Sequence, residues 1–539
     1  MAGESHHNHS HGIDGDDNGY KGLNYLIVRP ENGGIRDLLR YTVWSDVGCG
    51  LRFLESSDED VAIGEAADHR LVILVSIIAR KVIAVLGKPM EWAGYLVDFI
   101  LNLLSQNGEL TGLVYNFVHG KVVVPQRGTE TFISTIGHID GRIDLFMGKS
   151  SGEDVNGSVS GETRLKIELG NRAFMDLCIM ASKLAYENAK MHFVDFYDCW
   201  NDFQKEMSTQ VFILCDKPED ANLILISFRG TEPFDADDWI TDFDYSWYEI
   251  PELGKVHMGF LEALGLGNRT DAVTFQNHLL QVKNTKLPTS EGNKSSSSNT
   301  YLGQGRRGWG QSSDSGEPSA IGGKVIPPEM VEKTAYYVVR SRLKGLLEEH
   351  KNAKFVVTGH SLGGALAILF PTILVLHEEM EMMDRLLGVH TFGQPRIGNR
   401  QLGNFMENHL DNPVPKYFRV VYCNDLVPRL PCDDKTFLYK HFGVCLYYDS
   451  RYNDRIVKEE PNRNYFGITY LIPDYLNAVW ELIRSLTMGY KYGPEYKEGW
   501  FSLMVRVMGL ALPGISAHCP TDYVNSVRLG EERISHSEF

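Results

Sequence analysis

The residues best suited to do chemistry in this chain lie around Ser361, in the run KFVVTGHSLGGALAILF. Residues 354–358 are apolar and β-branched, which predicts a buried strand, whereas residues 362–370 predict a helix, so Ser361 falls on the turn between them. Glycines occupy positions 359 and 363, where a Cβ atom would clash across a sharp turn. This pattern predicts a nucleophile elbow, which presents a serine hydroxyl for attack on a carbonyl carbon.

A serine nucleophile needs an acid that orients its base, and in α/β-hydrolases the acid follows the serine along the chain. Asp425 fits this position best, because it comes directly after the apolar strand in YFRVVYCNDLVPRLP, where a loop can carry its carboxylate to an imidazole. The other nearby aspartates are expected to be solvated turn residues: Asp411, Asp433, Asp434 and Asp449.

Three histidines follow Asp425 and compete for the role of general base. His536 is close to the end of the chain, where residues are poorly held. His441 lies at the start of an apparent strand, which favours a structural, hydrogen-bonded histidine. His518 lies on a loop before a helical pattern, and catalytic groups favour loops, so His518 is the predicted base and His441 the alternative.

The negative charge that develops on the substrate oxygen requires two preorganised donors. The backbone N–H of Leu362, directly after the nucleophile, is the first. Thr231 follows the strand in LILISFRG and is the predicted second donor, through its N–H and its hydroxyl. A threonine that only caps the next turn is the alternative.

The elements that position these residues alternate between helix and strand. Strands are predicted at Val211–Cys215, Leu223–Phe228, Val389–Phe392 and Tyr417–Cys423, and helices at Asn171–Asn188 and Pro327–His350. The predicted fold is therefore an α/β-hydrolase with a mostly parallel central sheet, over residues 160–539. Residues 287–323 are rich in Ser, Gly and Asn and predict a disordered insertion, and Asn464–Pro513 predicts an insertion near the mouth of the site.

An apolar helical region is predicted before this domain. Residues 1–60 are assigned to a partly disordered tail, and residues 61–150 to a lipid-anchoring region around the apolar run Leu71–Leu104. That run is interrupted at Arg80-Lys81 and at Gly87-Lys88-Pro89, and neither half reaches the length of a membrane span. We expect a hairpin held in one lipid leaflet, with the two basic side chains reaching the head groups; a buried hairpin of a soluble domain is the alternative.

The net charge of −17 over 539 residues, without a basic stripe, argues against nucleic acid as a partner. Eight cysteines are scattered without CxxC spacing, and the chain does not begin with a basic stretch followed by an apolar one. These features predict a reducing, cytosol-facing location. The predicted chemistry requires no cofactor or metal.

Several motifs in order resemble the class 3 (fungal-type) lipases: FRGT at 228–231, DWITD at 238–242, VHMGF at 256–260, GHSLGG at 359–364, TFGQPRIGN at 391–399 and NDLVPRLP at 424–431. The resemblance covers Val211 to Leu529 and is closest to the plant oil-body triacylglycerol lipases. It implies hydrolysis of acylglycerols and attachment to lipid droplets. It also implies a lid within Glu232–Gly254, whose apolar side chains would face lipid: Trp239, Ile240, Phe243, Trp247 and Tyr248.

The sequence therefore predicts a triacylglycerol lipase that hydrolyses long-chain acylglycerol esters at a lipid-droplet or membrane surface, through an acyl-enzyme intermediate. A phospholipase A1 or galactolipase with the same triad is the alternative within the enzyme class, because head-group contacts lie in variable loops. A lipid-surface scaffold without chemistry is the alternative outside it.

Overall fold

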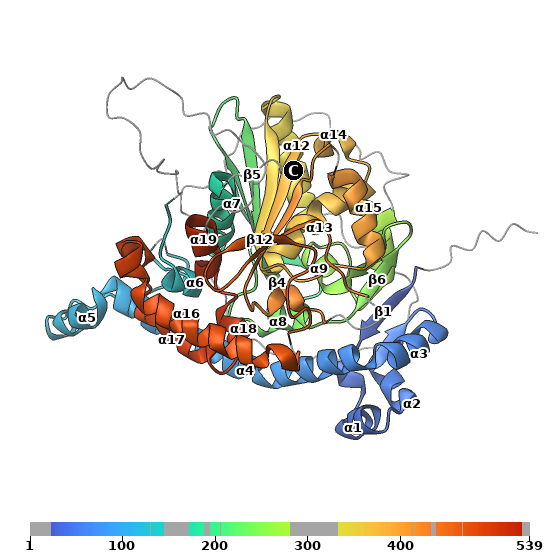
Figure 1. The fold of residues 1–539 in the computed structure, drawn as a ribbon. Coiled ribbons are helices and arrows are strands. Elements are labelled where there is room, and N and C mark those ends of the chain that lie inside the picture. The colour runs from blue at the N-terminus through green and yellow to red at the C-terminus, as the bar shows by residue number, and fades with distance from the viewer. Residues whose placement is uncertain are drawn as a thin grey trace, which may run out of the picture.

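The computed structural model describes residues 23–129, 131–144, 172–187, 195–204, 206–280, 333–411, 413–432, 438–465 and 467–530. The predicted insertion at 287–323, His536, Asp433 and Asp434 lie outside these residues. The described chain forms a central sheet with helices on both faces, and a long helix runs past one end of that sheet (Figure 1).

Eight strands form the central sheet, in the order β12-β11-β10-β9-β8-β5-β4-β3. The five strands from β11 to β5 run parallel to their neighbours, while β3, β4 and β12 are added antiparallel at the two edges. The predicted mostly parallel sheet is confirmed. The strands are β3 (Asp195–Asn201), β4 (Glu206–Cys215), β5 (Leu223–Phe228), β8 (Lys354–His360), β9 (Leu386–Phe392), β10 (Tyr417–Tyr422), β11 (Val444–Tyr448) and β12 (Asp454–Val457).

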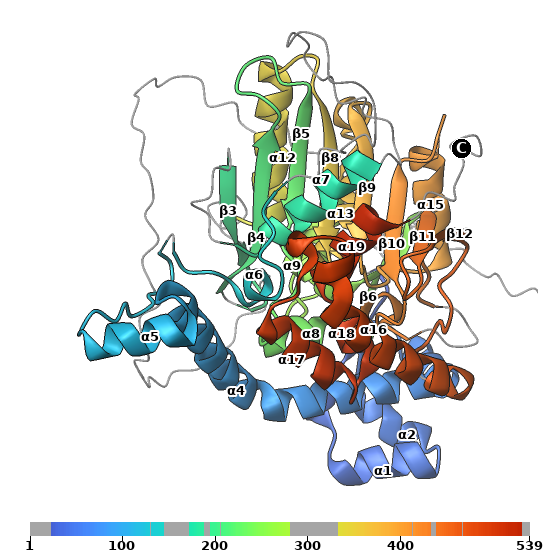
Figure 2. The same ribbon diagram turned by 60° about the vertical axis from the view of Figure 1, so that its left-hand side comes forward.

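Helices cover both faces of this sheet because its parallel strands are apolar on both sides. On β8, Val356 packs into the core under one face, whereas Phe355 and Val357 pack into the core under the other. Helices α7 (Arg172–Leu184) and α19 (Pro520–Leu529) cover the first face (Figure 2). The second face carries α9 (Met258–Ala263), α10 (Val273–Leu280), α12 (Ala335–Glu349), α13 (Leu362–Leu376), α14 (Met380–Met383) and α15 (Arg400–Leu410).

The predicted N-terminal tail is wrong for the described part of residues 1–60. The strand β1 (Tyr25–Val28) pairs with β6 (Trp247–Ile250) in a second, four-stranded sheet with β2 (Leu54–Ser56) and β7 (Gly254–His257). Ile27 is fully buried in the core of the catalytic region. A four-residue strand whose partner lies more than 200 positions along the chain leaves no local signal. The short helices here are α1 (Ile35–Val43), α2 (Val47–Gly50) and α3 (Glu59–Asp68).

The predicted hairpin at Leu71–Leu104 is also wrong, because these residues lie in one helix, α4 (Arg70–Gln106). Pro89 lies inside it, and a proline removes one helical hydrogen bond without ending a helix that tertiary contacts hold on both sides. Arg80 and Lys81 do not reach outward. Arg80 Nη1 lies 2.8 Å from Asp244 Oδ1, and Lys81 Nζ donates to the Gly33 carbonyl at 3.1 Å.

Two C-terminal helices lie beside α4 at the same end of the molecule, α16 (Leu471–Lys491) and α17 (Trp500–Gly509) (Figures 1 and 2). Leu101 of α4 shares a buried cluster with Phe501 of α17. Short helices complete this end: α5 (Glu109–Val118), α6 (Thr135–Ile139), α8 (Ala236–Asp242) and α18 (Pro513–Ser516). Within the described ranges, no helix has both the length and the apolar character needed to cross a membrane.

Candidate active site

Ser361 lies on the turn between β8 and α13, as predicted. Its backbone has φ 59° and ψ −134°, a strained conformation that turns the chain sharply from strand to helix. A Cβ atom at Gly359 would lie 2.1 Å from the Gly363 carbonyl oxygen, and one at Gly363 would lie 2.2 Å from that of Phe228. Both positions therefore require glycine. The Ser361 N–H donates to the Phe392 carbonyl at 2.9 Å, which ties the elbow to β9.

The structure brings Asp425 and His518 together across 93 residues of chain. Asp425 follows the end of β10, and His518 lies on the turn between α18 and α19. His518 Nδ1 donates to Asp425 Oδ2 at 2.8 Å, while Asp425 Oδ1 accepts the N–H of Val427 at 2.9 Å. The carboxylate is fully buried. This contact leaves the other ring nitrogen of His518, Nε2, available for a proton; it is buried and has no hydrogen-bond partner among the described residues.

His360 connects the elbow to the loop of His518, and sequence reasoning missed it. Its ring stacks on the His518 ring with centroids 4.6 Å apart, and its Nε2 lies 3.0 Å from the His518 carbonyl oxygen. A carbonyl only accepts, so Nε2 carries the proton and Nδ1 accepts the Tyr186 hydroxyl at 3.0 Å. Burial, together with the nearby His518, holds the pKa of His360 well below its usual range. His360 is therefore a neutral positioning group.

Thr231 lies next to the elbow, at the end of β5. A Cβ atom on the preceding Gly230 would come within 2.3 Å of the His360 carbonyl oxygen and 2.9 Å of Ser361 Cβ, so the two strand ends nearly touch. Leu362 begins α13, and the first N–H groups of a helix have no partner within it. The two predicted oxyanion donors thus come from adjacent strand ends, as the chemistry requires.

Asp242, at the end of α8, is a second residue that sequence reasoning did not identify. The Thr231 hydroxyl donates to Asp242 Oδ2 at 3.1 Å, while Oδ1 has no hydrogen-bond partner among the described residues. Burial raises the pKa of Asp242 to about 7, and the nearby His518 opposes that rise. The motif DWITD contains this residue, but its burial beside the site could not be read from the motif.

Tyr523 is a third missed residue, five positions after His518 on α19. Its hydroxyl donates to Asp425 Oδ2, the oxygen that also accepts from His518. A Cβ atom on Gly393 would lie 2.9 Å from Asp425 Oδ2, from His518 Cε1 and from the Tyr523 oxygen. Gly393 therefore leaves the space in which these three groups meet.

The other predicted candidates lie elsewhere. His441 is buried, and its Nε2 donates to the Pro428 carbonyl at 2.7 Å, so the structure does not bring it to Asp425. Asp411 is exposed, and the Asp449 carboxylate accepts from the backbone N–H groups of Arg451 and Asn453 and from Asn453 Nδ2, as expected for turn residues.

The predicted lid is only partly in the expected place. Trp239 and Ile240 lie on α8 and Phe243 directly follows it, and all three are partly buried. Trp247 and Tyr248 are fully buried in β6, so their assignment to a lipid-facing lid is wrong. Two large aromatic residues among aspartates predict an amphipathic surface segment, whereas β6 pairs with β1 and its two aromatic side chains pack into two different cores.

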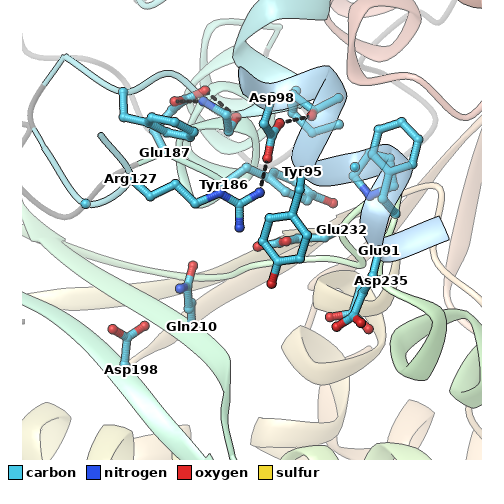
Figure 3. A pocket seen from close by; sticks show the side chains of 18 of the residues that line it. Glu91, Tyr95, Asp98, Arg127, Tyr186, Glu187, Asp198, Gln210, Glu232 and Asp235 are labelled. Atoms are coloured by element: carbon cyan, nitrogen blue, oxygen red, sulfur yellow. Dashed lines mark hydrogen bonds and ion pairs between the residues drawn. The ribbon is translucent and has the colours of Figure 1, made fainter. Parts of the chain in front are cut away.

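A cavity of about 330 Å³ lies beside the site, between α4, the loop at 127–136 and the segment that follows Thr231 (Figure 3). Tyr186 links it to His360. Its walls carry carboxylates opposed by one guanidinium, Arg127, so it does not suit an apolar acyl chain. Arg127 Nη2 lies 2.5 Å from Asp98 Oδ2 and its guanidinium covers the Tyr95 ring at 4.3 Å. The carboxylates are Glu91, Asp98, Glu187, Asp198, Glu232 and Asp235.

The described residues contain no cluster of three or more side chains that could hold a metal ion. Together, the buried acid–imidazole pair, the strained serine and the two adjacent donors can carry out acyl transfer through a serine ester.

Comparison with known proteins gives close relatives along almost the whole chain. The family model described as Lipase (class 3) matches residues 225–435. A protein of Nicotiana tabacum named Triacylglycerol lipase OBL1 is 62% identical over 549 residues, which cover 94% of this chain and 95% of that protein. A protein of Arabidopsis thaliana with the same name is 57% identical, again covering 94% and 95%.

Among solved structures, a Rhizomucor miehei lipase in complex with its propeptide is 20% identical, with a TM-score of 0.30, and covers 51% of this chain and 65% of that one. The lipase Lip2 of Yarrowia lipolytica is 17% identical with a TM-score of 0.30, and covers 51% and 77%.

Proposed function

This chain belongs to the class 3 lipases and, within them, to the plant triacylglycerol lipases, and we propose that it hydrolyses long-chain acylglycerols at the surface of lipid droplets with Ser361, His518 and Asp425 as its catalytic triad. The observation that carries the proposal is the 2.8 Å contact between His518 and the buried Asp425, beside a serine on a strained elbow. The relatives that are 62% and 57% identical bear the name of this activity.

In the proposed reaction, Ser361 Oγ attacks the ester carbonyl carbon while His518 Nε2 takes the hydroxyl proton. The tetrahedral intermediate then breaks its C–O bond to the glycerol moiety, and His518 returns the proton to the departing alcohol. A water molecule, deprotonated by the same nitrogen, attacks the acyl carbon; the C–O bond to Ser361 then breaks, His518 returns the proton to Ser361 Oγ, and the fatty acid leaves. Asp425 keeps the proton of His518 on Nδ1 and stabilises the imidazolium that forms twice in each cycle.

The N–H groups of Leu362 and Thr231 hold the oxyanion of both tetrahedral intermediates. They need no reorganisation when the charge develops, because the elbow and the end of β5 are already packed together. Asp242 orients Thr231 through the threonine hydroxyl.

The proposal that the protein binds a lipid surface is based on three helices at one end of the molecule. Their outward sides carry large apolar side chains at helical spacing, and such a wide exposed apolar surface marks an interaction site. The substrate is insoluble in water, so we assign this surface to a lipid monolayer. The side chains are Val82, Val85, Leu86, Trp92, Leu96 and Phe99 on α4, Ile472, Leu476, Val479, Trp480 and Ile483 on α16, and Trp500, Met504, Val507 and Met508 on α17.

The reaction is tested by presenting the purified protein and its Ser361→Ala variant with emulsions of triacylglycerol, diacylglycerol, phospholipid and galactolipid. We expect release of fatty acid from the neutral glycerides by the parent protein alone. Preferential release from phospholipid or galactolipid would replace the proposed substrate with the alternative one. An organophosphonate that fails to label Ser361 would favour a scaffold without chemistry.

The surface is tested by flotation with triacylglycerol droplets coated by a phospholipid monolayer. Replacing Leu476 and Ile483, which are 64% and 50% exposed, by Asp should weaken binding at least about 100-fold, because each apolar side chain contributes about 1.5–3 kcal/mol. Val414→Asp is the matched control, since Val414 is exposed before β10 at the opposite end of the sheet. Unchanged flotation of the α16 variant, or a dimer of the parent protein that this variant abolishes, would show that the surface serves another purpose.

A further inference from the structure

Ser361 is buried, and α8 packs beside the oxyanion site next to it. The serine is only 1% exposed. Asp238 and Thr241 of α8 line a cavity of about 10 Å³ together with Leu362 and Leu366 of α13, so α8 lies directly against the helix that begins at the nucleophile. The contact between Asp242 and Thr231 fixes the end of α8 to the oxyanion site. An acylglycerol can reach a serine buried this deeply only when a covering segment moves, and we take α8 to be that segment because it packs beside Thr231 and the start of α13.

The outer side of α8 is covered by the middle of α4 (Figures 1 and 2). Two glycines seven positions apart, which share one side of the helix, lie at this contact. A Cβ atom on Gly87 would lie 3.2 Å from Ala236 Cβ, and one on Gly94 would lie 2.6 Å from Phe234 Cβ. The backbone of α4 thus rests directly on α8 and on the segment that leads into it, and α8 cannot move outward while α4 stays in place.

The opposite side of this part of α4 is apolar and exposed. Trp92 is 75% exposed and Val85 76%, and both lie among the side chains assigned above to the lipid surface. The same short stretch of helix therefore holds α8 on one side and presents apolar side chains on the other. If the exposed apolar side of α4 inserts into a lipid surface, α4 moves away from α8 and their contact weakens.

The stretch between the two glycines is also the weakest part of α4. Pro89 lies between them and cannot donate the backbone hydrogen bond of a regular helix, so the helix can bend there. The cavity of about 330 Å³ next to Gly94 and Phe234 leaves space on one side of the contact. Both ends of the helix are held, by the ion pair of Arg80 with Asp244 and by Leu101 in its buried cluster.

We propose that the stretch from Gly87 to Gly94 of α4 is a strap that holds α8 closed over Ser361, and that binding of the outer side of α4 to a lipid monolayer releases it. This inference rests on the proposed hydrolysis and lipid-surface binding. The same helix then detects the interface and opens the site, so the enzyme turns over only where its substrate is present.

The first test ties the strap to α8 with a disulfide between Gly87→Cys and Ala236→Cys, whose Cβ positions lie close to the range a disulfide spans. The full-length double variant is assayed on a triacylglycerol emulsion, on a soluble short-chain ester and by flotation, oxidised and then reduced. We expect oxidation to lower emulsion hydrolysis at least about tenfold and reduction to restore it. The single-cysteine variants, oxidised in parallel, control for the native cysteines. Equal rates of the oxidised and reduced double variant would overturn the proposal.

The second test loosens the strap. Gly94→Ala forces a methyl group against Phe234, which penalises the closed arrangement, so hydrolysis of the soluble ester without lipid should rise about fivefold or more. Gly64→Ala on α3 is the matched control, because a Cβ atom there meets no neighbour within 4 Å. Equal rates of these two variants would also overturn the proposal. If the parent protein fails to hydrolyse triacylglycerol, the proposed function fails instead, and the soluble-ester rates still test the strap.

Discussion

Replacing Asp242 by Asn tests the electrostatics of the site most directly. Asp242 is completely buried, and burial raises the pKa of its carboxyl from 3.8 to about 7. Asn keeps an oxygen that accepts the Thr231 hydroxyl and cannot ionise. Its amide N–H replaces the Oδ1 atom that has no partner among the described residues. That unsatisfied donor costs about 1–3 kcal/mol, and this cost does not depend on pH.

The free energies of unfolding of the parent protein and of Asp242→Asn differ by an amount that depends on pH, and the sign of this dependence is fixed. The folded state holds the proton more tightly than the unfolded state, so the stability that Asp242 contributes is fully present below pH 3.8 and is lost as the pH rises to about 7. At about 1.4 kcal/mol per pH unit, the loss reaches about 4 kcal/mol. Above pH 8 both states are ionised and the difference stays constant.

Urea unfolding of the two proteins from pH 4 to pH 9 measures this directly. The free energy of unfolding of Asp242→Asn, relative to the parent protein, should rise by several kcal/mol between pH 4 and pH 7 and then level off. Contributions of groups that do not interact with Asp242 cancel in the difference. A difference that is flat across this range would show that Asp242 is ionised or solvated in the folded protein, and would refute the reasoning.

Four further predictions concern the triad and the residues considered with it. Ser361→Ala should lower turnover by on the order of 10⁴-fold or more while the melting temperature is retained, and near-normal turnover by the pure variant would end the serine mechanism. His518→Ala should match that loss, and the double variant should be scarcely worse. By contrast, His441→Ala should cost about 1–3 kcal/mol of stability in urea unfolding, because a buried hydrogen bond is lost; an inactive His441→Ala of normal stability would reverse the two assignments. Tyr523→Phe should remove about 1.5–3 kcal/mol of stabilisation from the Asp425 carboxylate. It should lower kcat by a larger factor than it changes KM, and an unchanged kcat would show that Tyr523 is only structural.

The N-terminal region cannot be removed without consequence, contrary to what its composition indicates. β1 supplies Ile27 to the main core, and Arg80 is one of two guanidinium groups bound to the buried Asp244. Loss of one of these groups leaves Asp244 only partly compensated inside the protein. The proposed lipid-binding surface and the catalytic region are therefore parts of one folded unit.

The sequence alone determined those features whose signal is local. The elbow at Ser361 is a strand, a turn that only glycine permits and a helix within a single run of residues. Asp425 and Thr231 each follow an apolar strand directly, and the ends of parallel strands meet at one edge of a sheet, so their placement near Ser361 followed from the chain order.

Only the tertiary structure decided what depends on distant segments. Local context favoured His518 over His441, but the contact of His518 with Asp425 depends on how 93 residues fold back, which no local pattern specifies. The burial that raises the pKa of Asp242 comes from packing the end of α8 against Thr231 and the catalytic loops, which are distant in sequence. The sequence shows an interrupted apolar run in α4, and only the packing separates the glycine side, which covers α8, from the side that remains exposed. Hydrophobic periodicity reports how apolar a helix face is, whereas the partner of that face is set by the rest of the chain.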